Sequence, residues 1–458
     1  MTSTNDNDDD WLVCFVFVVI LYSVIAVVHI LCPARIVKGY ACNPLSIKDE
    51  NPQPLEYCLN GFRCFWIVVG GFLALHYVLP NKIITLFLQK NYFGCAMASN
   101  GLGLLVSFYF VYIRFPYSLS LQEQAANDIR RAPTIVALQT TNVPIQQQGN
   151  TLDERGFHFF NGRELNPRFH LAWVDNCWPL KNDNLKPKID SCHNHTIFDV
   201  KMFLYIVGAL VLELNILSGV WCEQELRGDN TNSNGMLLYT ALFTWFILDY
   251  MWYEEIHLYT YDLFAEKVGF KLIWGCFCFY PFVYPIGVLP FLMAPTAESA
   301  WSFPAMALIT LIYIAGSVMT RGANLQKYYF RRNPHQRQVA LFGGLLVLPQ
   351  ETVPSSNNRL LCSGFWGLSR HVNYIGEILQ AVALALPGWW HIVTAAENDT
   401  GNNATVLMWL PWLYPLYYVA LFIPRQLEDE HMMRRKYGDK VMDDYCARVP
   451  YRMLPGVY

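Results

Sequence analysis

Residues 11–32 read WLVCFVFVVILYSVIAVVHILC, a run of 22 residues that contains no Asp, Glu, Lys or Arg. About 20 mostly apolar residues suffice for a helix to cross a bilayer, where the backbone polar groups must be hydrogen-bonded within the helix. The run has no basic leading segment and no small-residue cleavage site, so we expect a retained span rather than a signal peptide. This run therefore indicates a membrane protein.

Apolar runs of similar length recur along the chain. They occupy residues 61–79, 93–113, 202–222, 236–252, 269–293, 301–319, 374–393 and 405–423. The composition agrees, since 53% of the 458 residues are hydrophobic and only 15% are charged, against about 25% in an ordinary soluble domain. The run 269–293 contains Pro281, Pro285 and Pro290, which must break or kink a helix, and broken membrane helices usually line a cavity. The sequence thus predicts an all-α polytopic membrane protein with about 9 to 10 transmembrane helices.

Charge, cysteine content and motifs exclude several other classes of protein. The net charge of −3 gives no indication of a nucleic-acid partner, and we expect none. The 13 Cys include no CxxC pair, and Cys276 and Cys278 have the wrong spacing for a zinc site on a helix, so we expect no bound metal. There is no Walker loop and no GxGxxG after a strand, so any nucleotide must bind without a Rossmann domain.

The basic residues indicate which loops face the cytoplasm. Between Arg321 and Arg370 there are seven Lys or Arg and one acid, Glu351, so this connection should be cytoplasmic. Two spans later the tail after Arg425 returns to the same side, which predicts a cytoplasmic C-terminus. The loop 394–404 between those spans carries two glycosylation sequons, which suits a lumenal loop.

The spans and loops divide the chain into three regions. Residues 1–114 hold the N-terminal transmembrane helices, 115–201 form a polar loop, and 202–458 form the C-terminal transmembrane region with the candidate sites. Within the loop, residues 122–150 are rich in Gln, Asn and Thr, and we expect a mobile insertion there. A further sequon at Asn194 should lie on the cytoplasmic side and stay unmodified.

Polar side chains at the ends of spans are the first candidate functional groups, because charges are costly in a bilayer. Five of them straddle the end of the run 236–252, where a solvated helix end explains them equally well: Asp249, Glu254, Glu255, His257 and Asp262. Residues 279–285 read FYPFVYP and place Tyr280 and Tyr284 among prolines, although such aromatics usually serve packing or the interfacial belt.

Stronger signals follow the run 301–319. Lys327 and Arg331 are four residues apart and share a helix face, which suits a phosphate group, although a positive flank explains the charge by itself. Further on, Gly364 allows close backbone approach before a donor-rich span entrance, which is formed by Arg370, His371, Asn373 and Tyr374. The tail from Arg425 carries seven basic and six acidic residues, so its charge suits a solvated helix better than a lipid-binding patch.

These C-terminal stretches resemble the membrane sterol reductase family, which includes delta-14-sterol reductases, the C-terminal domain of lamin B receptor, 7-dehydrocholesterol reductase and fungal delta-24(28)-sterol reductases. Residues 361–377, within LLCSGFWGLSRHVNYIGE, look like the family signature LLxSGWWGxxRHxNYxGD. Residues 429–438 and 448–458 resemble its closing motif. The similarity runs from about Gly156 to Tyr458.

Other stretches resemble the delta-14 and lamin B receptor versions in particular. They are NGRELNPR at 161–168, RGANLQK at 321–327, FRRNP at 330–334 and DYMWYEE at 249–255. Phe365 and Glu377 depart from the signature, and 279–285 keeps only the Pro, Phe and Tyr of the delta-14 pattern WVPFTYS. Because these departures fall near the expected substrate pocket, a delta-7 or delta-24(28) double bond stays open as the target.

The resemblance implies NADPH as cofactor, a sterol as substrate and the endoplasmic reticulum membrane as location. It places the NADPH and sterol pockets in residues 202–458, with the cofactor pocket on the cytoplasmic side. Lys327 and Arg331 would meet the adenosine phosphate end. The other residues that it assigns to the cofactor site or its edge are Leu361, Trp366, His371, Asn373, Tyr374, Arg425, Asp429, Met433, Arg434, Arg435, Lys436, Tyr437 and Tyr445.

Reduction of an unactivated sterol alkene by NADPH requires an acid as well as a hydride donor. Protonation of one alkene carbon gives a tertiary carbocation, which needs a dry pocket with negative or π character until hydride quenches it. Tyr284 is our candidate proton donor, with Tyr445 or Tyr451 in support. A tyrosine with an ordinary pKa of about 10 is a weak acid, so we expect a hydrogen-bond chain that links it to Asp249 or Glu255.

Two other classes of protein remain as alternatives. Isoprenylcysteine-type methyltransferases share the pattern RHxxYxG before their last spans, but they are shorter and lack the GANLQK stretch at 322–327. A non-catalytic membrane scaffold is the second alternative. The chain shows no basic, Ser/Arg-rich N-terminal extension of the kind that a chromatin tether needs, which disfavours it.

Overall fold

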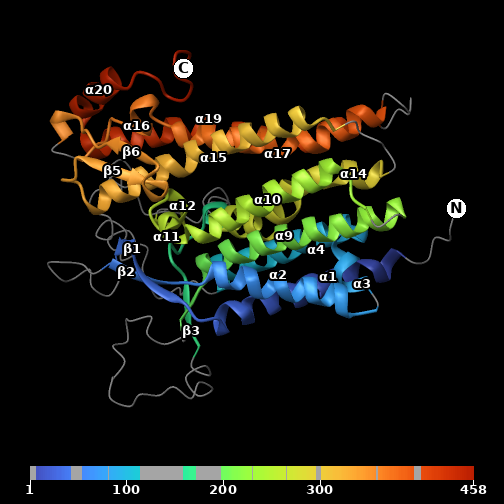
Figure 1. Ribbon diagram of the computed structural model, residues 1–458. Coiled ribbons are helices and arrows are strands. Elements are labelled where there is room, and N and C mark those ends of the chain that lie inside the picture. Colours follow the sequence, from blue (N-terminus) through green and yellow to red (C-terminus); the bar gives the residue numbers. More distant parts are fainter. Residues whose placement is uncertain are drawn as a thin grey trace. The chain divides into compact units, whose positions relative to one another are not determined.

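The computed structural model of the protein describes ten stretches of the chain, which Figure 1 draws in colour. They are residues 7–42, 54–80, 82–113, 158–171, 197–228, 231–264, 266–295, 301–356, 359–396 and 404–458. The expected insertion at 122–150 and the sequons at Asn194, Asn398 and Asn403 lie outside these residues.

The structure confirms an all-α polytopic membrane protein. In the described part of the chain, eight helices are long and apolar enough to cross a membrane. They are α1 (Asn7–Leu31), α2 (Gly61–Val78), α4 with η2 (Tyr92–Phe108 and Tyr109–Ile113), α9 (Val200–Arg227), the segment Phe270–Met293, α15 (Phe303–Arg332), α17 (Val372–Ala396) and α19 (Leu413–Tyr437) with the turns before it. A ninth expected span, α10 (Asn234–Trp252), is helical throughout but less apolar, because two Thr and Asp249 lie within it. Eight described helices are thus long and apolar enough to span a membrane, where the sequence predicted about nine or ten.

The chain folds into two compact units, each with its own helices. One comprises the described residues up to Thr231 together with 243–285, and the other comprises 232–242 and 286–458. The boundaries fall within α10 and within η4 (Tyr284–Val288), a 3₁₀ turn. Each unit therefore has to be understood from its own contacts.

In the first unit, α9 is the central helix. It is buried on nearly all sides, as expected for a helix that is hydrophobic all round. It contacts α1, α2, α3 (Ile83–Lys90) and η3 (Gly275–Val283), a π-helix. Asp199 caps its N-terminus, where the carboxylate accepts a hydrogen bond from the Met202 N–H at 3.1 Å.

The first unit also contains two antiparallel strand pairs that the sequence analysis did not predict. They are β1 (Arg35–Cys42) with β2 (Pro54–Leu59), and β3 (Arg168–His170) with β4 (Ile197–Asp199). Arg168 links the two pairs, because its guanidinium pairs with Asp199 at 2.8 Å and donates to the Glu56 carbonyl at 2.8 Å. The unit also holds short helices, which are α11 (Glu254–His257), α12 (Tyr261–Phe264) and α13 (Phe270–Trp274).

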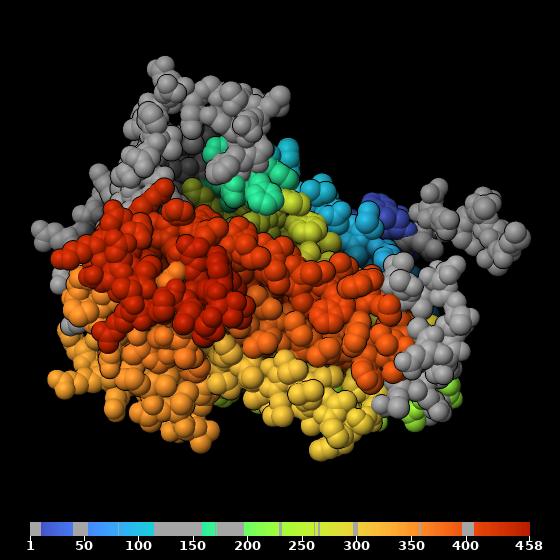
Figure 2. Space-filling view, turned by 90° about the horizontal axis from the view of Figure 1, so that it is seen from above, coloured from blue at the N-terminus to red at the C-terminus, as the bar shows by residue number. Residues whose placement is uncertain are grey.

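The second unit is built on the close pairing of α15 with α17, and α17 in turn contacts α19 (Figure 1). Glycines allow the first pair to approach, since a Cβ on Gly316 would lie 2.6 Å from the Gly376 carbonyl oxygen. The shorter elements are α14 (Leu289–Met293), the hairpin of β5 (Gln338–Leu341) and β6 (Leu346–Pro349), α16 (Phe365–Leu368), α18 (Ala404–Trp409) and α20 (Asp439–Arg448). Figure 2 shows α20 and the C-terminal residues, in red, beside the orange residues that precede α17.

Candidate functional site

The prolines of the run 269–293 break the helix, as predicted. The chain passes from α13 through η3 and η4 to α14 without a continuous α-helix. Pro281 and Pro285 have no N–H, so the carbonyls of Phe277 and Pro281, four residues earlier, lose their usual helical donors. The Tyr22 hydroxyl donates to the Phe277 carbonyl at 2.5 Å, and the Asn215 amide donates to the Pro281 carbonyl at 3.0 Å. Side chains of α1 and α9 thus replace the bonds that the prolines remove.

Further side chains of the first unit hold the same segment. Tyr92 on α4 donates to the Phe282 carbonyl, and Gln89 on α3 donates to the side-chain oxygen of Asn215 at 2.7 Å. Asn215 is therefore oriented on both sides, as an acceptor from Gln89 and as a donor to the broken segment. These bonds fix the backbone that precedes Tyr284.

Tyr284, the candidate proton donor, lies in a cluster of aromatic side chains. Its ring meets the ring of Tyr280 edge to face, with 4.8 Å between the ring centroids. The Tyr280 centroid lies 6.3 Å from that of Tyr250. Tyr250 in turn stacks on Tyr205 at 4.0 Å and lies 4.3 Å from His257. We call these five residues the tyrosine cluster, and their rings supply the π character that a carbocation needs.

The carboxylates expected to assist the proton donor lie at and after the end of α10. Glu255 forms an ion pair with Arg35 of β1 at 3.0 Å, which compensates its charge. The neighbouring Glu254 is buried and accepts a hydrogen bond from the Gly61 N–H at 2.8 Å, and burial raises the pKa of this carboxyl to about 8. Asp249 is partly buried in the last turn of α10. The hydrogen-bond chain from the proton donor to Asp249 or Glu255 stays a prediction.

The second unit gathers basic side chains from α15 and α19. The Lys327 ammonium lies 5.2 Å from the centre of the Trp366 ring, and the Trp366 indole N–H donates to the Ala323 carbonyl at 2.9 Å. Lys327 interacts electrostatically with residues that the resemblance had grouped with it, which are Arg331, Arg425, Asp429 and Lys436. The fold therefore brings together side chains that lie about 100 residues apart in the sequence, as a bound polyanion would require.

One further basic residue belongs to this group, and the sequence analysis missed it. Lys436 interacts electrostatically with Arg359 as well as with Arg331. Arg359 precedes Leu360, whose side chain belongs to the same apolar cluster that Tyr437 packs against. No motif or helical spacing marks Arg359, so only the fold reveals it. We call the following residues the basic cluster: Lys327, Arg331, Arg359, Arg425 and Lys436.

Gln326 holds the signature loop against α15. Its amide oxygen accepts a hydrogen bond from the Phe365 N–H at 3.0 Å, and its amide nitrogen donates to the Ser363 carbonyl at 3.1 Å. Gly364 lies between these two residues with a φ of 61°, and a Cβ there would lie 2.4 Å from Gln326 Nε2. The position therefore requires glycine, which confirms the close approach expected at Gly364.

Tyr374 connects α17 to α19. Its hydroxyl donates to Asp429 Oδ2 at 2.5 Å, and its ring stacks on those of His371 and Phe422, with centroids 5.3 and 4.4 Å away. The adjacent Asn373 is partly buried. Asp429 is thus oriented by Tyr374 and lies within the electrostatic reach of the basic cluster.

The remaining residues of the expected cofactor site have different surroundings. Arg434 pairs with Asp439 and Asp443 at 3.1 and 2.9 Å, so its charge is neutralised within α19 and α20. Arg435 is exposed. Among the apolar members, Leu361 is buried. The Arg434 guanidinium thus joins α19 to α20 through these two ion pairs.

The two tyrosines named in support of the proton donor differ in burial. Tyr445 is enclosed in an apolar cluster against which Met433 and Tyr437 pack. Burial raises the pKa of Tyr445, so its hydroxyl is a poorer proton donor than that of an ordinary tyrosine. Tyr451 is exposed, and its carbonyl accepts the backbone N–H of Arg370 at 3.0 Å.

Glu430 ties the C-terminal tail to the start of α17. Its carboxylate accepts hydrogen bonds from Arg370 Nε at 2.7 Å and from Arg452 Nε at 3.1 Å. Arg370 also donates to the carbonyls of Val449 and Pro450 at 2.7 and 2.9 Å. Arg370 of the signature thus anchors the tail, and we call these contacts the Glu430 clamp.

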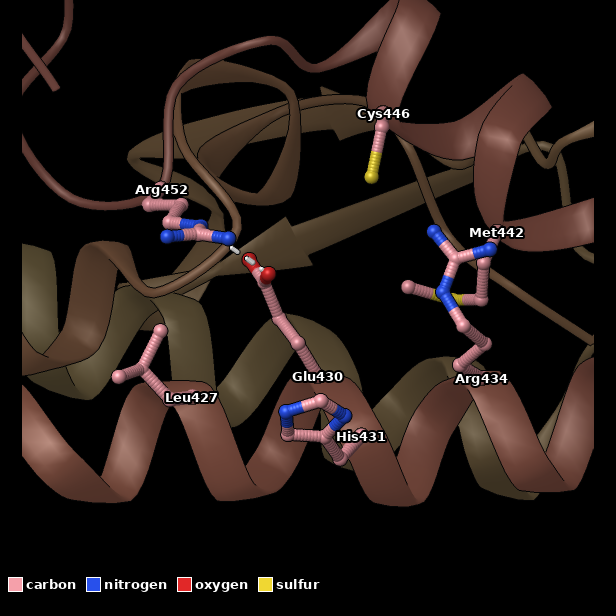
Figure 3. Close-up of a pocket in the computed structure, with 7 residues that line it drawn as sticks. All are labelled: Leu427, Glu430, His431, Arg434, Met442, Cys446 and Arg452. Carbon is pink, nitrogen blue, oxygen red and sulfur yellow. Dashed lines mark hydrogen bonds and ion pairs between the residues drawn. The ribbon is translucent and has the colours of Figure 1, made fainter. Parts of the chain in front are cut away.

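A pocket lies beside this clamp (Figure 3). It is lined by Leu427, Glu430, His431, Arg434, Met442, Cys446 and Arg452. Figure 3 shows Arg452 directed at Glu430 from the tail. The cavity measures 130 Å³, whereas sites for small organic ligands usually exceed about 300 Å³. This pocket is therefore too small to hold a dinucleotide.

Comparisons with known proteins extend along almost the whole chain. The model of the ergosterol biosynthesis ERG4/ERG24 family matches residues 3–458. The chain is 31% identical to delta(14)-sterol reductase TM7SF2 of Mus musculus over 420 residues, which cover 90% of this chain and 79% of that protein. It is 29% identical to delta(14)-sterol reductase LBR of Gallus gallus over 431 residues, which cover 93% of this chain and 53% of that protein. It is 27% identical to delta(14)-sterol reductase erg24A of Aspergillus fumigatus over 459 residues, with 97% and 82% covered.

Proposed function

The chain belongs to the ergosterol biosynthesis ERG4/ERG24 family of sterol reductases, and on this premise we propose that it is an NADPH-dependent delta(14)-sterol reductase. The observation that carries the cofactor assignment is the basic cluster, in which Lys327 interacts electrostatically with Arg331, Arg425 and Lys436, and Lys436 with Arg359. A dinucleotide with a third phosphate on its adenosine carries several negative charges, and grouped Lys and Arg side chains suit them.

The residues of the second unit would divide the cofactor between them. Lys327 and Arg331 would bind the adenosine phosphate end, and Arg359 and Lys436 would extend the positive surface along the phosphates. Trp366 offers an aromatic face beside Lys327. The remaining residues proposed for the cofactor site are Leu361, His371, Asn373, Tyr374, Arg425, Asp429, Met433, Arg434, Arg435, Tyr437 and Tyr445.

The chemistry requires one hydride and one proton. When bound, NADPH supplies the hydride. Tyr284 would give its hydroxyl proton to one alkene carbon, and the rings of the tyrosine cluster would stabilise the carbocation that forms on the other. Asp249 or Glu255 would return a proton to Tyr284, while Tyr445 and Tyr451 keep a supporting role in this proposal.

The proposal also includes the location of the protein. The seven basic residues between Arg321 and Arg370 support a cytoplasmic connection, and the tail after Arg425 would share that side. We place the protein in the endoplasmic reticulum membrane with a cytoplasmic C-terminus, where cytosolic NADPH reaches the basic cluster. Its partners would be the sterol and the lipid bilayer.

A different double bond remains as the second candidate. Residues 279–285 differ from the delta-14 pattern at four of seven positions, and Tyr280, one of the four, contacts the Tyr284 ring. A delta-7 or delta-24(28) reductase is therefore the alternative within the family. The family match over residues 3–458 leaves the methyltransferase alternative without support.

A sterol panel tests the proposal. Purified protein in detergent micelles is incubated with NADPH and sterols unsaturated at the delta-14, delta-7 or delta-24(28) position, and products are identified by gas chromatography with mass spectrometry. We expect reduction of the delta-14 sterol, and loss of that product in Lys327→Ala at limiting NADPH. Reduction of another sterol alone would select the alternative. NADPH binding without reduction of any sterol would instead favour a scaffold.

A further inference from the structure

The proposed reaction gives the hydroxyl of Tyr280 no role. Its hydroxyl oxygen is shielded from solvent and has no hydrogen-bond partner among the described residues. A buried hydroxyl without a partner costs about 1–3 kcal/mol, so its place in the fold calls for an explanation such as a catalytic role or a bound water.

The surroundings of Tyr280 are shaped to receive its ring. Gly208 on α9 faces it, and a Cβ on Gly208 would lie 2.7 Å from Tyr280 Cδ1. The backbone around Tyr280 is held by the hydrogen bond from Tyr22 to the Phe277 carbonyl, three residues earlier, and by that from Asn215 to the Pro281 carbonyl, one residue later. Ring and backbone are thus both positioned, and the orphaned hydroxyl is a feature of a defined conformation.

The ring contacts form an ordered series from the end of α10 to the proton donor. Centroid distances are 4.3 Å from His257 to Tyr250, 6.3 Å from Tyr250 to Tyr280 and 4.8 Å from Tyr280 to Tyr284. Every member of this series carries a group that can both donate and accept a proton. Because the Tyr280 hydroxyl has no hydrogen-bond partner among the described residues, proton transfer between it and a neighbouring hydroxyl would use one bridging water.

Two of the carboxylates near this series are engaged by other groups. Glu255 is paired with Arg35, and Glu254 accepts the Gly61 N–H. Cys276 and Asp262 interact electrostatically with Tyr250. Glu254 interacts with Tyr205, which stacks on Tyr250. The His257 ring lies 4.3 Å from that of Tyr250 at an angle of 47°, on the short helix α11 that follows the expected span, and an imidazole can both take up and release protons near neutral pH.

We propose that Tyr280 is a positioning residue for Tyr284, and that its hydroxyl, in place of a direct return from Asp249 or Glu255, gives back to Tyr284 the proton that Tyr284 gives to the sterol. This inference rests on the proposed function. The Tyr284 O–H bond breaks as a C–H bond forms on the alkene, and the hydride from NADPH completes the reduction. Tyr284 regains its proton from the Tyr280 hydroxyl. Tyr280 is protonated again from His257 through Tyr250, and water restores the proton of His257.

The position supports a role particular to this chain. Tyr280 occupies the second place of FYPFVYP, where the delta-14 pattern WVPFTYS has Val. Tyr284 occupies the sixth place, which is Tyr in both. Tyr280 thus places a hydroxyl, where the resembling pattern has none, beside the proposed proton donor.

Tyr280→Phe removes the hydroxyl and keeps the ring. We expect kcat to fall about tenfold or more with a delta-14 sterol, while the KM for NADPH stays within about twofold. Proton return would then limit turnover, so the solvent deuterium isotope effect on kcat should increase and the remaining kcat should rise as the pH is lowered. Tyr280→Val installs the residue of the resembling pattern and should show the same changes in kcat and in the solvent isotope effect. It serves as the test if Tyr280→Phe does not fold.

Phe279→Leu is the matched control. Phe279 also contacts the Tyr284 ring, at 5.8 Å between centroids, but it has no hydroxyl. This variant should leave the solvent isotope effect and the pH dependence of kcat as in the wild type. If Tyr280→Phe keeps kcat within twofold and the wild-type isotope effect, the inference is overturned while the proposed function stands. A wild-type protein that reduces no sterol would overturn both.

Discussion

Glu430→Gln replaces the carboxylate of the Glu430 clamp with an uncharged amide of the same shape. The side chain of Arg370 is 7% exposed, that of Glu430 15% and that of Arg452 36%. The amide oxygen can still accept a hydrogen bond from Arg370, but it no longer offsets the guanidinium charge, so this buried contact, worth about 1.5–3 kcal/mol with the carboxylate, should lose about 1.5 kcal/mol. The contact with Arg452 should lose only about 0.5 kcal/mol, because water screens it. The tail should then open about 2 kcal/mol more easily.

Limited proteolysis measures this opening. When opening is fast relative to cleavage, the cleavage rate follows the population of the open form, and about 2 kcal/mol corresponds to roughly a 30-fold faster loss of the C-terminal peptide. The peptide is released by chymotrypsin from protein in detergent micelles and quantified by mass spectrometry. Glu428→Gln, at an exposed position of the same helix, is the matched control and should stay within about twofold of the wild type. Equal cleavage rates in the two variants would refute the role assigned to the Glu430 clamp.

Other contacts predict measurable effects. Burial raises the pKa of Glu254 from 4.5 to about 8, so the thermal stability of the wild type should fall as the pH rises from 4.5 through 8, and Glu254→Gln should remove most of that dependence. Gly208→Ala places a Cβ 2.7 Å from the ring of Tyr280, so thermal melts should show about 1–3 kcal/mol of destabilisation. Gly101→Ala, whose Cβ would have no neighbouring atom within 4 Å, should show little destabilisation. Lys327→Ala should raise the KM for NADPH at least about tenfold, while Lys440→Ala, at an exposed position, should leave it unchanged in the same steady-state assay.

The sequence was sufficient for the transmembrane helices and for the break in one of them, because both depend on local composition. An apolar run of the length of residues 11–32 has few alternatives to a spanning helix, and Pro281 cannot donate a helical hydrogen bond in any context. The short strands β1 to β6 could not be predicted in this way. They are three to eight residues long and are fixed by pairing partners rather than by their own pattern.

Motifs and helical spacing led to most of the candidate cofactor residues, whose role stays a prediction. Lys327 and Arg331 share a helix face by spacing alone, and the signature indicated residues such as Trp366, which the structure brings within 5.2 Å of the Lys327 ammonium. Arg359 was missed because its relation to Lys436 depends on the fold of a loop 77 residues earlier in the chain. The pairing of Arg434 with two aspartates of α20 was equally invisible, since a helix surface pattern does not show where the chain turns.

The broken segment also explains how its side chains can change without displacing the proton donor. The carbonyls of Phe277, Pro281 and Phe282 accept hydrogen bonds from Tyr22, Asn215 and Tyr92, which belong to three other helices. None of these bonds uses a side chain of the segment itself. The shape of the backbone before residue 284 therefore depends on the donors and on the prolines, while positions such as 280 can gain or lose a hydroxyl. This arrangement would allow the proposed proton path to vary on a constant backbone framework.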